Sequence, residues 1–160
     1  MWYYMIACYF LSLITLGMVG VGFFQSFLKF PLFHANHPTW MIFTSIVYFF
    51  TETLVIFFFV GAGMGVKEFS EKQKMGPEFY RDLILVKRKV YPPLLLNILF
   101  MIVLFVLVGA VDTYHFPSRA YPFVFLGCLL HLVKSKGVQH QAFRETAEIV
   151  FKISQVRKGL

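Results

Sequence analysis

The chain has 160 residues, of which 58% are hydrophobic and only 14% are charged, and its net charge is +7. A water-soluble domain carries about 25% charged residues, so this composition excludes an ordinary soluble protein and indicates residence in a membrane. The basic residues flank apolar segments, which favours contact with lipid headgroups and argues against nucleic acid as a partner.

Four segments are apolar and long enough to cross the hydrocarbon core, which is about 30 Å thick and needs roughly 20 helical residues. They cover residues 3–28, 38–66, 92–111 and 121–138. The fourth is the weakest candidate because Lys134 and Lys136 enter its last turn, and we expect their long side chains to reach the headgroups. The sequence therefore predicts an all-α fold, a single membrane domain that forms a bundle of four transmembrane helices.

Closely spaced glycines occur in the first two spans, and small residues let helices approach closely in a membrane. They are Gly17, Gly20, Gly22, Gly61, Gly63 and Gly65. We expect these positions to lie at contacts between helices.

The connection between the second and third spans has a helical pattern of its own. Residues 77–90 follow Gly76 and begin with a proline, as helices often do. Their apolar residues recur at helical spacing, at Phe79, Leu83, Val86 and Val90. We predict a short amphipathic helix on the inner leaflet that ends at Pro92 and Pro93. Residues 139–160 are also amphipathic and predict a helical tail that lies on the membrane or docks onto a partner.

The distribution of lysine and arginine predicts how the chain is threaded. Thirteen of the 15 basic residues lie in the connection between the second and third spans or at and beyond the end of the fourth. The other two connections carry one each, Lys29 and Arg119. Because basic residues concentrate on the cytoplasmic side, we expect both termini and the 67–91 connection to be cytoplasmic, or on the equivalent side of an organelle.

Glu52 lies near the middle of the second span, among aromatic and branched apolar residues. An ionised carboxylate at that depth costs a few kcal/mol, and burial disfavours the charged form unless a partner neutralises it. Ser45, Tyr48 and Glu52 lie along one helical face, so we expect this polar stripe to face the interior of the bundle. Two interpretations stay open: a protonatable group near a quinone, a proton path or an ion, and a neutral carboxyl bonded to another helix or subunit.

Three histidines fall in the predicted outer connections, His34 and His37 before the second span and His115 after the third. If these connections meet, the three would form a zinc or copper site. Alternatively, His37 and His115 would hold a haem axially. Pro38 disfavours a helix at His37, and ordinary interfacial histidines are the remaining interpretation.

His131 is inside the predicted fourth span, and we group it with Tyr48 and Glu52 as candidate cofactor-binding residues. A haem held between two helices commonly needs two histidines at similar depth, and the first three spans contain none. A haem in the bilayer would therefore be shared with a partner subunit.

No motif in the chain identifies an activity, since it has no P-loop, no nucleophile elbow and no H-E-x-x-H sequence. Small four-helix anchors of respiratory complexes share this size and layout, which is an analogy of architecture only. We expect a non-catalytic anchor or accessory subunit of a larger, energy-transducing electron-transfer complex, with a quinone or haem shared between subunits. Its partners would be the lipid bilayer, other membrane subunits and a peripheral protein on the cytoplasmic side. The alternatives are a small transporter or channel that uses Glu52, and a membrane enzyme with an outer-face histidine metal site.

Overall fold

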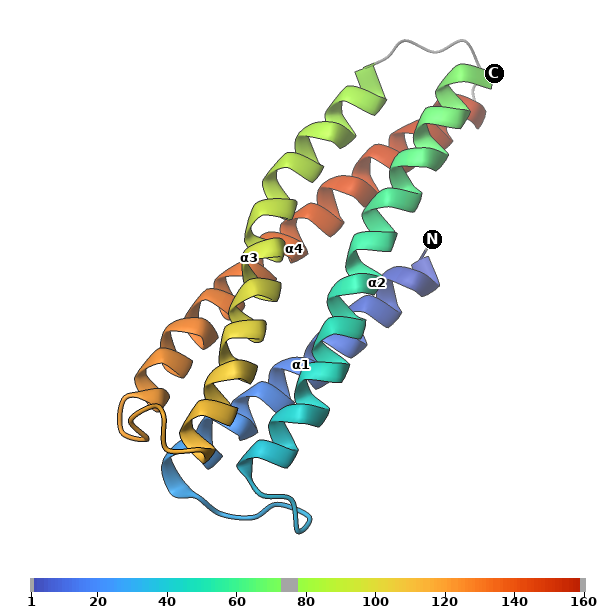
Figure 1. Ribbon diagram of the computed structural model, residues 1–160. Helices are drawn as coiled ribbons and strands as arrows, with labels where there is room; N and C mark the ends of the chain where they lie inside the picture. The colour runs from blue at the N-terminus through green and yellow to red at the C-terminus, as the bar shows by residue number, and fades with distance from the viewer. Residues whose placement is uncertain (1, 73–77, 159–160) are drawn as a thin grey trace.

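The computed structural model is a bundle of long α-helices, and it describes residues 2–72 and 78–158 (Figure 1). The helices are α1 (Trp2–Leu28), α2 (His37–Lys72), α3 (Glu78–Asp112) and α4 (Tyr121–Lys158). The predicted all-α four-helix bundle is thus confirmed. Three of these helices, α1, α2 and α3, are long and apolar enough to cross a membrane. The fourth crossing, by α4, stays a prediction.

The four helices pack in a ring in chain order, and α1 closes the ring by packing against α4. As a result, α2 and α4 face each other across the bundle. The short loops at 29–36 and 113–120 lie at one end, and the chain termini point toward the other (Figure 1). We name the end with the two loops the outer end, after the predicted threading, and the opposite end the inner end.

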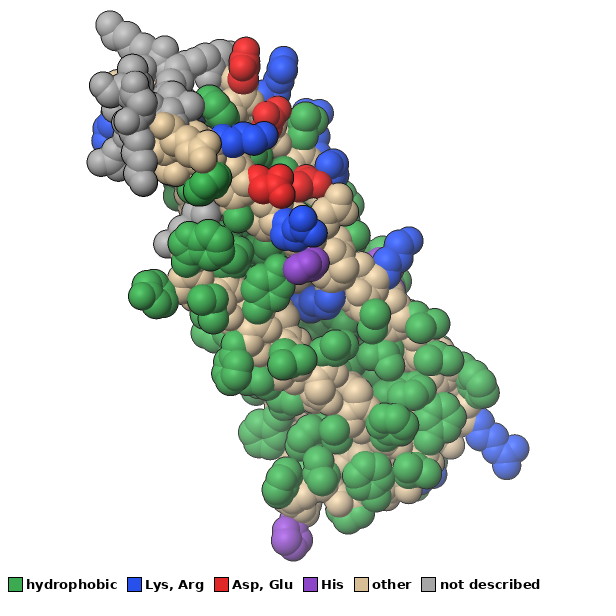
Figure 2. Space-filling view, turned by 180° about the vertical axis from the view of Figure 1, so that it is seen from behind, with side chains coloured by type: hydrophobic (Ala, Val, Ile, Leu, Met, Phe, Trp, Pro, Cys, Tyr) green, Lys and Arg blue, Asp and Glu red, His purple; other side chains and the backbone are tan. Residues whose placement is uncertain are grey.

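Three helices extend beyond the first at the inner end (Figure 1). At about 1.5 Å per residue, α2, α3 and α4 are each roughly 50 Å long or longer, whereas α1 is roughly 40 Å long. The hydrocarbon core is only about 30 Å thick. Figure 2 shows most of the charged side chains gathered over the inner end and mainly apolar side chains over the rest of the face in view. We call the charged ends of the three longer helices, residues 67–72 of α2, 78–89 of α3 and 144–158 of α4, the inner extension.

The bundle core consists of two apolar clusters with a polar layer between them. The outer cluster contains Val19, Met41, Tyr48, Met101, Leu104, Val108, Tyr121, Phe125 and Leu132. The inner cluster contains Cys8, Val55, Phe58, Phe59, Val86, Val90, Leu94, Ala142 and Phe143. The polar layer takes buried residues from all four helices: Thr15, Thr51, Glu52, Asn97, Ser135 and Gln139. Apolar positions three to four residues apart along each helix produce this packing, as in other helix bundles.

The third helix differs from the sequence-based prediction. Residues 78–90 are not a separate surface helix, because α3 continues without a break through Pro92 and Pro93. Proline removes a hydrogen bond from a helix interior, but Val90 and Leu94 on either side of the pair are fully buried and hold the helix in place. The prediction of a helix end at Pro92 was therefore wrong. The predicted helix start at Gly76 and Pro77 lies outside the described residues.

The last helix also runs farther than predicted. Residues 139–158 continue α4 directly, and the helix passes through Gly137. Ala142, Phe143 and Thr146 are buried against the bundle, so this segment is part of the core and is not a separate tail.

Only two of the six glycines in the first two spans lie close to a neighbouring helix. A Cβ atom added to Gly22 would lie 2.8 Å from the sulfur of Met41, and one added to Gly63 would meet the side chain of Lys87. The other four have no atom within 4 Å of such a Cβ: Gly17, Gly20, Gly61 and Gly65. The expectation of close helix approach holds for one glycine in each span, because the others face away from the bundle.

Candidate functional site

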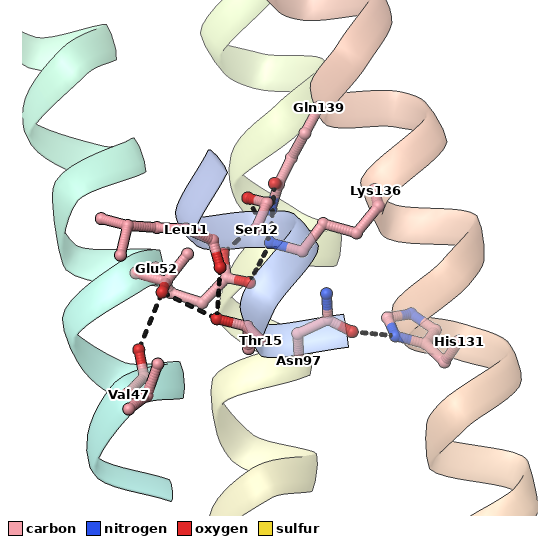
Figure 3. Close-up of polar contacts among 10 residues, drawn as sticks. Leu11, Ser12, Thr15, Val47, Glu52, Asn97, His131, Lys136 and Gln139 are labelled. Atoms are coloured by element: carbon pink, nitrogen blue, oxygen red, sulfur yellow. Dashed lines mark hydrogen bonds and ion pairs between the residues drawn. The ribbon is translucent and has the colours of Figure 1, made fainter. Parts of the chain in front are cut away.

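The carboxylate of Glu52 lies at the centre of the polar layer and is fully buried. The ammonium of Lys136 donates to Oε1 of Glu52 at 2.6 Å, and the amide of Gln139 donates to Oε2 at 2.9 Å (Figure 3). Both partners come from α4, across the bundle from α2. As predicted, the stripe of Ser45, Tyr48 and Glu52 faces the interior.

Lys136 makes three polar contacts with its ammonium. Besides Glu52, it donates to Oγ of Ser12 at 3.3 Å and to Oε1 of Gln139 at 3.1 Å. Glu52 and Lys136 each lie 15 residues after the first residue of their helices, so both are roughly 22 Å from the outer end. The expectation that Lys136 reaches the headgroups was wrong, because a buried carboxylate lies at the same depth and accepts its hydrogen bond.

Two further pairs of polar side chains belong to the same layer. The hydroxyl oxygens of Thr15 and Thr51 lie 2.8 Å apart and join α1 to α2. The ring Nδ1 of His131 lies 2.6 Å from Oδ1 of Asn97 and joins α4 to α3 (Figure 3). The amide nitrogen of Asn97 has no hydrogen-bond partner among the described residues. Among the described residues, polar side chains at this depth therefore link each pair of neighbouring helices except α2 and α3, and they also link α2 to α4.

The three residues predicted to bind a cofactor, Tyr48, Glu52 and His131, lie in this layer or next to it. Tyr48 lines a cavity of about 10 Å³ together with Asn97. That volume is about the space of one water molecule. The role of these three residues as cofactor ligands stays a prediction.

A larger cavity, lined in part by Lys136, lies between α1 and α4. It measures about 360 Å³, within the range of sites for small molecules. Its lining residues, which we call the α1–α4 groove, are Tyr9, Ser12, Leu13, Leu16, Lys136, Gln139, His140 and Phe143. The hydroxyl of Tyr9 lies 2.7 Å from Nδ1 of His140 at the inner end of this groove.

A further cavity of about 610 Å³ lies at the outer end, where the ends of all four helices meet. Both His37 and His115 line it, whereas His34 is an exposed residue outside its lining. Nε2 of His37 lies 3.1 Å from the hydroxyl of Tyr121, and Nδ1 of His115 lies 3.0 Å from Oγ1 of Thr113. The structure thus brings two of the three predicted histidines to one cavity.

The position of His37 follows from the local sequence. Oδ1 of Asn36 accepts hydrogen bonds from the backbone and hydroxyl of Thr39, so Asn36 caps the first turn of α2. His37 is therefore helical despite the following Pro38, because proline is well tolerated in a first turn.

The outer cavity contains buried polar atoms without partners. Oε1 of Gln25 and Nδ1 of His37 have no hydrogen bond to any residue that the structure describes. Within residues 2–72 and 78–158, no group of three or more His, Cys, Asp or Glu side chains is arranged to hold a metal ion. The zinc, copper or haem site at His34, His37 and His115 stays a prediction.

Sequence reasoning identified Glu52 but missed its partners. Lys136 and Gln139 are three residues apart and share one helical face, at the same depth as Glu52. That spacing was the available signal, but Lys136 also fits the pattern of a basic residue at a membrane surface.

Comparison of the chain with protein-family models, with curated protein sequences and with solved structures found no match.

Proposed function

We propose that this chain is a non-catalytic anchor or accessory subunit of a larger electron-transfer complex in the membrane. The observation that carries the proposal is the inner extension, where three packed helices continue beyond the length that a bilayer requires. A protein that only crossed a membrane would not need these charged helix ends. An anchor needs such a surface to bind a peripheral partner.

The inner extension has the composition of a docking surface. Exposed basic residues on α3 and α4, such as Arg81, Arg88 and Lys152, lie on the same part of the bundle as exposed Leu85 and Phe151. Basic residues attract anionic lipid headgroups and acidic protein surfaces, and exposed apolar side chains favour protein contact. We propose a peripheral protein on this side, and other membrane subunits around the apolar surface.

The polar layer supports a structural role over transport. Both carboxylate oxygens of Glu52 are occupied, one by Lys136 and one by Gln139. A coupling site in a transporter must exchange its ion or proton with water, whereas the carboxylate of Glu52 is fully buried and the side chain of Lys136 is only 14% exposed. Buried polar groups often fix the register of packed helices, and we assign this role to the layer.

The proposal includes α4 as a fourth crossing, with both termini cytoplasmic. Lys136 lowers the apparent hydrophobicity of α4, but its charge is neutralised by Glu52 at 2.6 Å. The helix also packs along α3 and α1, and both of these are candidate spans. The membrane would therefore meet a less polar helix than the sequence alone suggests.

A second candidate function is an outer-face ligand site. The 610 Å³ cavity and the unpartnered atoms of Gln25 and His37 favour it. Such a site would belong to a membrane enzyme or a binding subunit whose ligand enters from the outer side.

The experiment is purification of the tagged full chain from its native membranes in a mild detergent, followed by mass spectrometry and an absorption spectrum. We expect partners in fixed stoichiometry that include a redox protein. Arg81→Glu combined with Lys152→Glu should release the peripheral partner, whereas Arg119→Glu at the outer end is the matched control and should retain it. Recovery of the chain alone, with the same result for all variants, would contradict the proposal.

A further inference from the structure

We propose that the α1–α4 groove binds the ring of a membrane quinone. The inference rests on the proposed function, since an electron-transfer complex would supply this ligand. The groove lies beside the polar layer and shares Gln139 with it.

The groove offers hydrogen-bond donors that are not used within the chain. Oγ of Ser12 accepts from Lys136, and none of the described hydrogen bonds has this hydroxyl as donor. Tyr9 and His140 share one hydrogen bond of 2.7 Å, and in either histidine tautomer one N–H or O–H of the pair is left to donate outward. A quinone carries two carbonyl oxygens, which are acceptors, so it complements these donors.

The charge of the groove favours a neutral ligand. Lys136 and His140 are the basic residues in the lining, and the ammonium of Lys136 pairs with the buried carboxylate of Glu52 at 2.6 Å. The pair has no net charge, so it attracts a phosphate group weakly. A phospholipid headgroup is therefore a poorer match than an uncharged ring with carbonyl groups.

The depth of the groove also suits a quinone. His140 lies 19 residues after the first residue of α4, so it is roughly 28 Å from the outer end. With a hydrocarbon core of about 30 Å, the groove lies in the inner part of the core, just below the headgroups. A prenyl tail would remain in the hydrocarbon while the ring reached the polar groups.

The walls of the groove are apolar and open toward lipid. Leu13 on α1 is 69% exposed, so the groove has an opening on the lipid-facing surface. The rings of Tyr9 and Phe143 lie 5.1 Å apart between centroids and form an aromatic wall. Such a wall favours a flat ring by stacking or edge contact.

The test is photolabelling of the full chain in its native membranes with an azido-benzoquinone that carries a decyl tail. We expect covalent label on peptides of α1 and α4. An excess of unlabelled decyl-benzoquinone should prevent the labelling, and an excess of phosphatidylglycerol vesicles should not.

Two variants with matched controls locate the site. Ser12→Ala removes one donor and should weaken quinone competition about fivefold, the effect of one neutral hydrogen bond. Its control is Ser26→Ala on the same helix, because among the described residues Ser26 donates to a carbonyl of its own helix, that of Phe23, and does not line the groove. Leu16→Trp fills the groove and should abolish the labelling, whereas Leu95→Trp on the exposed face of α3 should leave it unchanged. Circular dichroism of each variant checks that the bundle is folded.

The outcomes separate this inference from the proposed function. Labelling that phosphatidylglycerol prevents, labelling that persists in folded Leu16→Trp protein, or no label on α1 and α4 would each overturn the quinone site. Partners that copurify without such labelling would leave the anchor function intact. Specific labelling of a chain that purifies alone would support the site and contradict the anchor function.

Discussion

The ion pair of Glu52 and Lys136 should stabilise the bundle only while both groups are present. Lys136→Met leaves a fully buried carboxylate with Gln139 as its remaining partner. Glu52→Gln leaves a partly buried ammonium without a counter-charge. Removal of one partner from a buried ion pair costs about 3–5 kcal/mol, and we expect each variant to lower the free energy of unfolding by that amount.

Removal of both charges should cost much less. In Glu52→Leu combined with Lys136→Met, neither charge has to be desolvated, and a hydrophobic replacement of a buried pair is often neutral or stabilising. Gln139 loses both of its partners in this variant, which costs about 1–3 kcal/mol for an unpaired buried amide. Addition of Gln139→Leu should recover that cost. The double variant should therefore differ from the sum of the single effects by about 3 kcal/mol or more.

The assay is unfolding in mixed micelles with increasing sodium dodecyl sulfate, followed by circular dichroism and by tryptophan fluorescence, which comes from Trp2 and Trp40. The control is Lys89→Met, which breaks the exposed pair of Lys89 and Glu145 at 3.3 Å between α3 and α4. An exposed pair contributes about 0–1 kcal/mol. If Lys136→Met lowers the free energy of unfolding no more than Lys89→Met does, the pair of Glu52 and Lys136 does not stabilise the bundle and the reasoning is refuted.

Three further predictions concern threading, packing and the outer histidines. Reporters fused after Leu160 and inserted near Gly76 should both be cytoplasmic, and opposite locations would mean that α4 does not cross the membrane. Gly22→Val should destabilise the bundle by about 1–3 kcal/mol, because a Cβ there would lie 2.8 Å from a sulfur atom of α2, while Gly20→Val should have no measurable effect on thermal unfolding in detergent. The outer-site hypothesis predicts that His115→Ala lowers the metal or haem content of the purified protein by a large factor, and unchanged content would contradict it.

Hydropathy was sufficient to predict the helices, because long apolar segments in a chain with few charges have no other stable state in a membrane. It also predicted that Glu52 faces inward, since a carboxylate is least costly in the interior of a bundle. It did not predict the continuous path of α3 through Pro92 and Pro93. Local propensity indicates a break there, but burial of the residues on both sides outweighs the missing hydrogen bonds.

The counter-charge of Glu52 could not be predicted from a local pattern. Lys136 is 84 residues away in the sequence, and a lysine at the end of a span normally contacts headgroups. The ammonium of Lys136 lies beside the carboxylate of Glu52 because of the depth at which α4 packs in the bundle. The same is true of the α1–α4 groove, whose residues come from the two ends of the chain and meet where α4 closes the ring.

The central claim, that this chain is a subunit of a larger membrane complex, is tested most directly by native mass spectrometry of the full chain released from its own membranes in mild detergent. The account predicts an assembly much heavier than the 18.6 kDa chain, with fixed stoichiometry and at least one redox protein. A spectrum that contains only the single chain, or only copies of it, would contradict the claim.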